Sequence, residues 1–283
     1  MNGVRVPCPA KVNLHLAVGA RDARGYHPIR TVFQAIDLCD ELRIEPAAQG
    51  SFRCDDPHVP PDNTVTKALR LASELVRLPP LRIELIKHIP AESGLGGGSS
   101  DAAGLLRALA KIAPIGQGAL HEIAAAVGAD VPFFLVGGRA LGEGYGERLT
   151  LLDDGLAEWL VVVRPNVGVS TSEAYAKLDA LPDRPIPQAG SELLPLMNDF
   201  ERVMPCDCEE WEDRLLVHGA IDALLCGSGS AVFGRFESEA RARAAAHLLG
   251  EEWTRSYGPP PPLGPVWVTR TLTRSESLRL ETL

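Results

Sequence analysis

A stretch of glycine and serine in the first half of the chain carries the clearest chemical signal. Between Gly94 and Ser100 only Leu95 is neither glycine nor serine, and the stretch lies between a strand-like segment and an amphipathic helix. Glycines let a phosphate approach the backbone closely, and the unpaired N–H groups at a helix start attract anions. The stretch therefore predicts a phosphate-binding loop, in which the Ser99 and Ser100 hydroxyls could reach phosphate oxygens or magnesium.

The sequence of this loop does not match the motifs of two better-known phosphate-binding loops. A Walker A loop ends in Gly-Lys-Ser/Thr, and no lysine follows these glycines. A dinucleotide fingerprint reads Gly-x-Gly-x-x-Gly, but counting from Gly94 the sixth position is Ser99. The remaining alternative is a flexible turn before a helix, which would not need so many small residues.

Length and charge narrow the class of protein. The chain has 283 residues, enough for one large domain or two closely packed ones. Its formal net charge of -9 argues against nucleic-acid binding and a membrane-surface role, since both usually need a basic face. No apolar run approaches the roughly 20 residues of a membrane span. Lys11 interrupts the apolar N-terminal stretch, so we expect a cytoplasmic protein without a signal peptide.

The six cysteines do not form a metal-ligand pattern. Only Cys206 and Cys208 are close in sequence, and no paired histidine or cysteine cluster accompanies them. We therefore expect reduced thiols and no metal site built from side chains.

Hydrophobic periodicity predicts a mixture of strands and helices that must position the loop. Alternating or apolar runs predict strands over 12–18, 31–38, 42–45, 81–89, 159–163, 231–236 and 266–271. Helical spacing and a capping Asn63 predict helices over 63–78, from Ala102 past Leu109, and over 121–127, 193–203, 209–218 and 237–249. Residues 182–187 read as a proline-rich connector, and 258–265 as a stiff loop.

Two further motifs accompany the loop. Pro-Ala-Lys-Val-Asn-Leu stands at 9–14, and a second glycine-rich turn, Leu-Cys-Gly-Ser-Gly-Ser-Ala-Val-Phe, stands at 225–233. Together with the loop, in this order, they resemble the three motifs of the GHMP kinases. The resemblance implies an α+β fold of two domains, placed at 1–153 and 154–283, with the active site in the cleft between them. It also implies ATP and Mg²⁺ as cofactors, with the ion held largely by phosphates and water.

The resemblance assigns roles to Lys11 and Asp130. In this family a carboxylate takes the proton of the substrate hydroxyl and a lysine stabilises the charge, as phosphoryl transfer requires. From local sequence alone, Asp130 also fits a turn or helix-capping aspartate, and Lys11 fits a solvated strand lysine. The ATP-binding residues implied are Pro90, Gly94, Leu95, Gly96, Gly97, Gly98, Ser99, Ser100, Gly227, Ser228 and Gly229.

Within the family, the chain is most similar to members that phosphorylate a hydroxyl of a cytidine diphosphate ester on the non-mevalonate route to isoprenoids. Three segments carry this similarity: Arg-Gly-Tyr-His at 24–27, Gly-Ala-Asp-Val-Pro at 128–132 and Met-Asn-Asp-Phe-Glu at 197–201. It implies that Tyr26, His27 and Tyr175 hold the cytosine, although Tyr175 also fits an ordinary helix-face aromatic. Asn13, Thr171 and Lys87 are the other substrate-binding residues implied.

Two alternatives stay open at this point. One is a GHMP kinase for another small molecule, of the homoserine or mevalonate type, which would give no reason for the Tyr26–His27 pair. The other is a nucleotide-binding regulator without catalysis, which predicts damage at Lys11 or Asp130. The expected partners are small molecules, with no nucleic acid and no membrane. The sequence does not indicate the oligomeric state.

Overall fold

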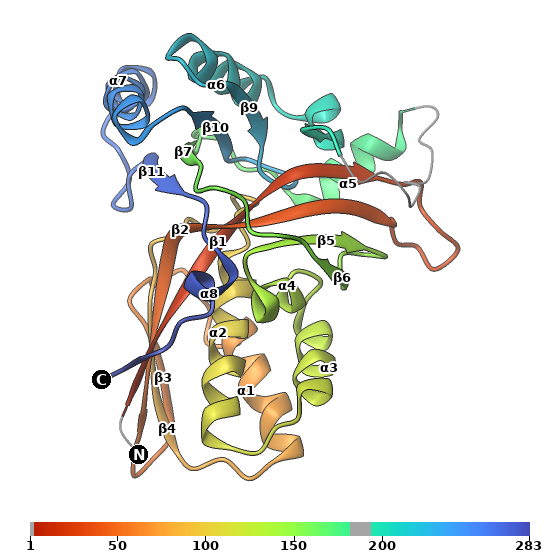
Figure 1. Ribbon diagram of the computed structural model, residues 1–283, viewed down its shortest axis with the longest axis vertical. Coiled ribbons are helices and arrows are strands. Elements are labelled where there is room, and N and C mark those ends of the chain that lie inside the picture. The colour runs from red at the N-terminus through yellow and green to blue at the C-terminus, as the bar shows by residue number, and fades with distance from the viewer. Residues whose placement is uncertain (1–2, 182–193) are drawn as a thin grey trace.

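The first of two sheets is built around two long strands. The computed structural model describes residues 3–181 and 194–283 (Figure 1). The main path of the first sheet runs β12-β1-β2-β4-β3, with β5 and β8 pairing at its side and β6 beyond β5. The bounds are β1 Val4–Val18, β2 Ile29–Pro46, β3 Ser51–Cys54, β4 Leu81–Ile86, β5 Arg139–Glu143, β6 Arg148–Leu151, β8 Met197–Asn198 and β12 Glu281–Thr282.

Strand β2 corrects the prediction of two separate strands over 31–38 and 42–45. It is one strand, and its pairing with β1 shifts register between Pro9 and Ala10, which face Cys39 and Ile36. The extra residues on β2 form a bulge. The bulge breaks the alternation of apolar and polar residues without ending the strand, and this is why the pattern indicated a gap.

Four helices cover one face of this sheet (Figure 1). They are α1 Thr64–Leu75, α2 Gly97–Ile112, α3 Gln117–Val127 and α4 Val131–Val136. Asn63 caps α1 as predicted, since its side chain accepts from the backbone N–H groups of Val65 and Thr66, although the helix ends before Leu78. The buried faces of α1 and α2 meet Val6, Leu42 and Ile44 of the sheet in one apolar core.

The second sheet is formed by four strands from the second half of the chain. Its order is β11-β7-β10-β9, all antiparallel neighbours, with β7 Trp159–Val163, β9 Asp222–Leu225, β10 Val232–Phe236 and β11 Val266–Arg270. Helices α5 Thr171–Asp179, α6 Cys206–Val217 and α7 Glu239–Tyr257 accompany it. Trp211 and Trp253 anchor α6 and α7 in a second core.

The predicted helix over 193–203 is wrong. Leu193 and the predicted connector 182–187 lie outside the described residues. From Met197 the chain forms β8, which pairs in parallel with β1, and then a single 3₁₀-helix, Asp199–Val203. The Asn198 side chain accepts from the N–H of Phe200, and such local side-chain bonds favour a short turn over a continuing α-helix.

The last residues return to the first sheet. After β11, the short helix α8 Arg274–Ser277 leads to β12, which pairs with β1, and Leu272 lies in the first core. The predicted division at 153/154 falls between the end of β6 and the start of β7, and it stays a prediction.

Strand β1 passes through all the apolar cores. It gives Val6 to the first core and Leu16 to the second. Between them, Ala10, Val12 and Leu14 pack into a third core with residues of β7 and β10. Because side chains alternate across a strand, the residues between these three, at 11 and 13, point to the opposite face. The sheet geometry therefore places Lys11 and Asn13 together.

Within 3–181 and 194–283, no helix is long and apolar enough to cross a membrane. The same residues contain no group of three or more histidine, cysteine, aspartate or glutamate side chains that could hold a metal ion. The six cysteines are free thiols.

One half-buried carboxyl group on α6 gives a prediction about how stability depends on pH. In α6, Glu212 has a buried Oε1 atom that finds no hydrogen-bond partner among the described residues. Burial, followed by the charge of Glu201, raises the pKa of Glu212 from 4.5 to about 8. The folded state therefore keeps this proton to higher pH than the unfolded state does. The resulting stabilisation is complete below pH 4.5 and is lost as the pH rises toward 8.

We expect Glu212→Gln to remove this pH dependence. Thermal unfolding measured from about pH 5 to about pH 9 should show a melting temperature that falls less with pH in the variant than in the parent protein. Glu122→Gln, at an exposed position of α3 that does not act on Glu212, is the control and should leave the profile unchanged. Parallel profiles for the parent and Glu212→Gln would contradict the assignment.

Candidate active site

A cavity of about 730 Å³ lies where the two glycine-rich segments meet the middle of β1. Its wall includes eight of the eleven residues predicted to bind ATP: Pro90, Gly94, Gly96, Gly97, Gly98, Ser99, Gly227 and Ser228. The other three, Leu95, Ser100 and Gly229, are not part of the wall. The Leu95 side chain is buried in the third core, and Ser100 is fully buried on α2.

The phosphate loop has the predicted strand–loop–helix form. The chain leaves β4 at Ile86, and α2 begins at Gly97, directly after Gly96 in the left-handed region at φ +76°. A Cβ on Gly96 would lie 2.9 Å from the Phe134 ring. The N-terminus of α2 therefore opens on the cavity, and its free N–H groups and positive dipole end suit an anion.

The second glycine-rich turn packs directly onto the first loop. A Cβ on Gly94 would lie 1.9 Å from the carbonyl oxygen of Cys226, and the N–H of Ala231 donates to the carbonyl of Ser93 at 3.1 Å. The Asn198 side chain stabilises the second turn, because its Nδ2 donates to the carbonyls of Leu225 and Gly227. This contact joins the second sheet to the phosphate loop.

Lys11 and Asp130 lie together at the cavity wall. Lys11 Nζ is 3.7 Å from Asp130 Oδ2 and donates to Asn13 Oδ1 at 2.7 Å. Asn13 Nδ2 in turn donates to Thr31 Oγ1 at 2.7 Å. Lys11 is only 4% exposed, so it is not a solvated strand lysine. Asp130 precedes α4 but makes no capping hydrogen bond with its side chain, so the carboxylate is left for Lys11 and the cavity.

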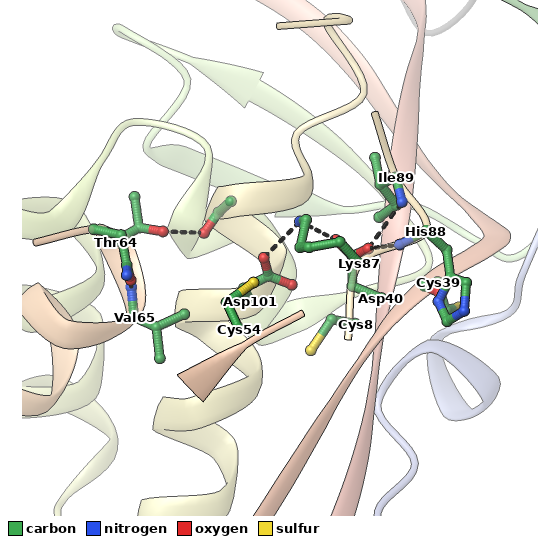
Figure 2. Close-up of polar contacts among 12 residues, drawn as sticks. Cys8, Cys39, Asp40, Cys54, Thr64, Val65, Lys87, His88, Ile89 and Asp101 are labelled. Carbon is green, nitrogen blue, oxygen red and sulfur yellow. Dashed lines mark hydrogen bonds and ion pairs between the residues drawn. The ribbon is translucent and has the colours of Figure 1, made fainter. Parts of the chain in front are cut away.

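Lys87 lies in a buried group of charges rather than standing free in the cavity (Figure 2). Its Nζ donates to Asp101 Oδ2 at 2.8 Å and to Asp40 Oδ2. Asp40 Oδ1 also accepts from the backbone N–H groups of His88 and Ile89, where the chain leaves β4 for the phosphate loop. Both Lys87 and Asp101 line the cavity. The group therefore ties β2, β4 and α2 together beneath the loop.

The charges in this group do not balance, because two carboxylates face one ammonium group. Burial alone would lower the pKa of Lys87, but Asp101 and Asp40 outweigh it and the pKa is raised. Burial, and then the charge of Asp40, raise the pKa of Asp101. Asp101 Oδ1 is buried without a hydrogen-bond partner among the described residues. Asp101 is thus the carboxyl that best tolerates a proton.

The predicted substrate residues are only partly brought together. Thr171 and Tyr175 of α5 and Asn13 line the cavity, and Thr171 Oγ1 lies 3.0 Å from Ser228 Oγ. The His27 ring stacks on the Tyr175 ring at a centroid distance of 4.6 Å. Tyr26 is 64% exposed and is not part of the wall.

Sequence reasoning missed several residues of the site. Asp40 gave no signal because it is one of several charged residues in its segment, beside Glu41, and Asp101 gave none because it directly follows the serines of the loop. Asn198 lies in the segment 197–201, which was used only as a sign of family resemblance. Its hydrogen bonds to Leu225 and Gly227 join parts of the chain that are distant in sequence, so they could not be inferred from neighbouring residues. Tyr145 also lines the cavity, from the turn between β5 and β6. It was missed because it belongs to none of the motifs described in the sequence.

The contact at Gly94 gives a sharp prediction. Gly94→Ala places a methyl group against the Cys226 carbonyl at a position with φ +77°, so the two turns must separate. We expect the phosphoryl-transfer activity predicted from the sequence to fall at least about tenfold and the melting temperature to fall with it. Gly250→Ala, in the interior of α7 where a Cβ meets nothing within 4 Å, is the matched control and should stabilise the fold by about 0.5–1 kcal/mol. Equal behaviour of the two variants would contradict the close contact.

The two carboxylates that face Lys87 give a second prediction. Asp40→Asn and Asp101→Asn are the same chemical change on either side of Lys87. We expect Asp40→Asn to destabilise the folded state by about 3 kcal/mol. The change breaks a buried ion pair and disturbs the two hydrogen bonds that Asp40 accepts from backbone N–H groups. Asp101→Asn should cost less than about 1 kcal/mol, since the amide resembles the protonated carboxyl. Urea unfolding measures both. A larger loss for Asp101→Asn would overturn this division of roles.

Comparisons with known proteins agree with this geometry. The family model described as "GHMP kinases N terminal domain" matches residues 63–138, which include the phosphate loop and Asp130. A "4-diphosphocytidyl-2-C-methyl-D-erythritol kinase" of Solidesulfovibrio magneticus is 41% identical, over 89% of this chain and 95% of that protein. The protein of the same name from Moorella thermoacetica is 36% identical, over 96% of this chain and 100% of its own.

Solved structures give the same result. A crystal structure of 4-(cytidine 5'-diphospho)-2C-methyl-D-erythritol kinase superposes with a TM-score of 0.78 at 34% identity, covering 94% of this chain and 98% of that one. Homoserine kinase from Cytophaga hutchinsonii, at 17% identity and a TM-score of 0.68, covers 96% of this chain and 95% of its own and shares the fold. With the α+β architecture and the cavity described above, these likenesses establish the family. The chain belongs to the 4-diphosphocytidyl-2-C-methyl-D-erythritol kinases, within the GHMP kinase fold.

Proposed function

We propose that this protein transfers the γ-phosphoryl group of ATP to the 2-hydroxyl of 4-diphosphocytidyl-2-C-methyl-D-erythritol, a step of the non-mevalonate route to isoprenoid precursors. The names of its relatives support the substrate. The observation that carries the proposal is the Lys11–Asp130 pair, 3.7 Å apart in the wall of the cavity that the phosphate loop also lines.

The pair supplies what the reaction needs. Asp130 takes the proton of the attacking hydroxyl as that oxygen forms its bond to the γ-phosphorus, and the bond to the β-phosphate oxygen of ADP breaks. Lys11 lies 3.7 Å from the Asp130 carboxylate and stabilises the negative charge that develops during transfer. Asn13 fixes the Lys11 ammonium group through its 2.7 Å hydrogen bond, so little rearrangement is needed during transfer.

The cofactors follow from the same site. The phosphates of ATP are proposed to lie on Gly94–Ser99 and on the N-terminus of α2. Hydroxyl, carboxylate and phosphate oxygens are the donors that Mg²⁺ prefers, and the cavity offers Ser99 and the carboxylate of Asp130. Ser99 and the nucleotide phosphates would hold the ion, with Ser100, whose buried Oγ finds no partner among the described residues, as the other candidate. Bound there, Mg²⁺ would neutralise charge on the β- and γ-phosphates.

We also propose a cytoplasmic location and small-molecule partners only. The free thiols suit a reducing compartment. The alternatives left open by the sequence are less well supported. Homoserine kinase shares the fold at 17% identity, against 36–41% for the named relatives. A regulator without catalysis does not require Lys11 and Asp130 to be present and paired.

Release of ADP from ATP and magnesium tests the proposal. We expect turnover with 4-diphosphocytidyl-2-C-methyl-D-erythritol and none with homoserine, mevalonate or galactose. Asp130→Asn should lower kcat by about 10²- to 10⁴-fold, since the amide cannot accept the proton. Lys11→Ala should lose about 10²-fold or more through charge stabilisation. Asp153→Asn, at an exposed position, is the control and should keep full activity.

The outcomes separate the parts of the proposal. Turnover with one of the other acceptors would keep the kinase and discard the substrate. Tight ATP binding without turnover of any acceptor would contradict catalysis. Full activity of a folded Asp130→Asn variant would remove the assigned base.

A further inference from the structure

Tyr145, in the turn between β5 and β6, lines the cavity together with the predicted substrate residues Asn13, Thr171 and Tyr175. This turn lies against the loop 19–28 that joins β1 to β2, because the N–H of Ile29 donates to the carbonyl of Gly144 at 2.7 Å. Tyr145 itself is held in the turn, since its backbone N–H donates to Glu147 Oε2 at 2.6 Å. Two loops distant in sequence therefore meet at this residue.

The Tyr145 hydroxyl reaches across to the loop 19–28. It donates to Asp22 Oδ2 at 2.6 Å. The other oxygen of Asp22 accepts from the backbone N–H groups of Arg24 and Tyr26, at 2.9 and 3.0 Å. The Asp22 N–H also donates to the carbonyl of Tyr26 at 2.7 Å. The hydrogen bonds of Asp22 thus determine the conformation of the turn that contains Tyr26. The bond from Tyr145 attaches this turn to the cavity wall.

The electrostatics agree with this geometry. The hydrogen bond from Tyr145, followed by that from the Tyr26 backbone, lowers the pKa of Asp22 to about 2. The Arg24 guanidinium lies 4.9 Å from the centre of the Tyr145 ring and is also 3.4 Å from Asp22 Oδ2 through its Nε. An ionised acceptor makes the hydroxyl bond of Tyr145 stronger than a bond between neutral groups.

The rings complete the arrangement. Tyr26 and Tyr145 lie with their centroids 5.4 Å apart at 51°, and only Tyr145 lines the cavity. Tyr26 stands exposed behind it. A side chain that must stack on a base from such an exposed loop needs a support that limits its conformations, since ordering it on binding would cost entropy.

We infer that Tyr145 is a positioning residue for the cytidyl substrate, holding Asp22 through its hydroxyl and thereby orienting the exposed Tyr26 beside it. The inference rests on the proposed function, because it assigns the support to the base-binding end. It predicts that the Tyr145 hydroxyl improves substrate binding by acting on Tyr26. Removing the hydroxyl should therefore weaken binding only when Tyr26 is present.

A double-mutant cycle tests this prediction. We expect Tyr145→Phe to raise the KM for 4-diphosphocytidyl-2-C-methyl-D-erythritol about three- to tenfold, as loss of a charge-assisted hydrogen bond in a partly solvated site. The kcat and the KM for ATP should stay within about twofold. In a Tyr26→Ala background the same change should add nothing. Direct binding of CDP, measured by titration calorimetry, needs no turnover and should weaken in parallel.

The control is Tyr257→Phe, which removes another tyrosine hydroxyl bonded to an aspartate, here Asp207 at 3.1 Å, and lies outside the cavity wall. It should change neither KM. An unchanged KM in Tyr145→Phe, an equal rise in the KM for ATP, or a full effect in the Tyr26→Ala background would each overturn the inference. Absence of turnover in the parent protein would instead overturn the proposed function, so the two failures are distinguishable.

Discussion

Two backbone turns meet in this molecule with no room for a side chain between them, and the active site depends on that contact. Gly94 of the phosphate loop lies against the Cys226 carbonyl, and the N–H of Ala231 bonds to Ser93. One turn continues into α2 and the other belongs to the second sheet. The cavity wall is made from both, so a kinase site exists only while the two sheets keep this distance. The same contact explains why glycine is needed there, beyond any need of a phosphate.

Strand β1 supplies the second constraint. Its apolar face packs Ala10, Val12 and Leu14 into the third core, which fixes the opposite face of the strand beneath the loop. The backbone N–H of Lys11 bonds to the carbonyl of Leu95, so the strand and the loop are held together directly. Lys11 is buried but not isolated, because Asn13 and Asp130 both face its ammonium group. A chain with a net charge of -9 can thus present a local cation to phosphate.

Much of this site could be predicted from sequence because its signals are local. The phosphate loop, the helix after it and the strand 159–163 follow from glycine content and short-range periodicity, and the structure has each of them. The resemblance assigned Lys11 and Asp130 to one reaction, and their side chains lie 3.7 Å apart. The bulge in β2, the 3₁₀-turn after Asn198 and the pairing of Lys87 with Asp40 could not be predicted. The bulge and the Lys87 pair depend on partners far away in sequence, about which periodicity carries no information. The turn depends on one local hydrogen bond, which Asn198 accepts from the N–H of Phe200.

The central claim is that Lys11 and Asp130 act as one unit in phosphoryl transfer. The most direct measurement is kcat/KM for the parent protein, Lys11→Ala, Asp130→Ala and the variant with both changes, each checked for a native melting temperature. If the residues act together, the double variant should be about as slow as the slower single variant, because groups that work as a unit lose their effect together. If the two losses multiply, the residues act independently, and the account of the site as a lysine–carboxylate pair is contradicted.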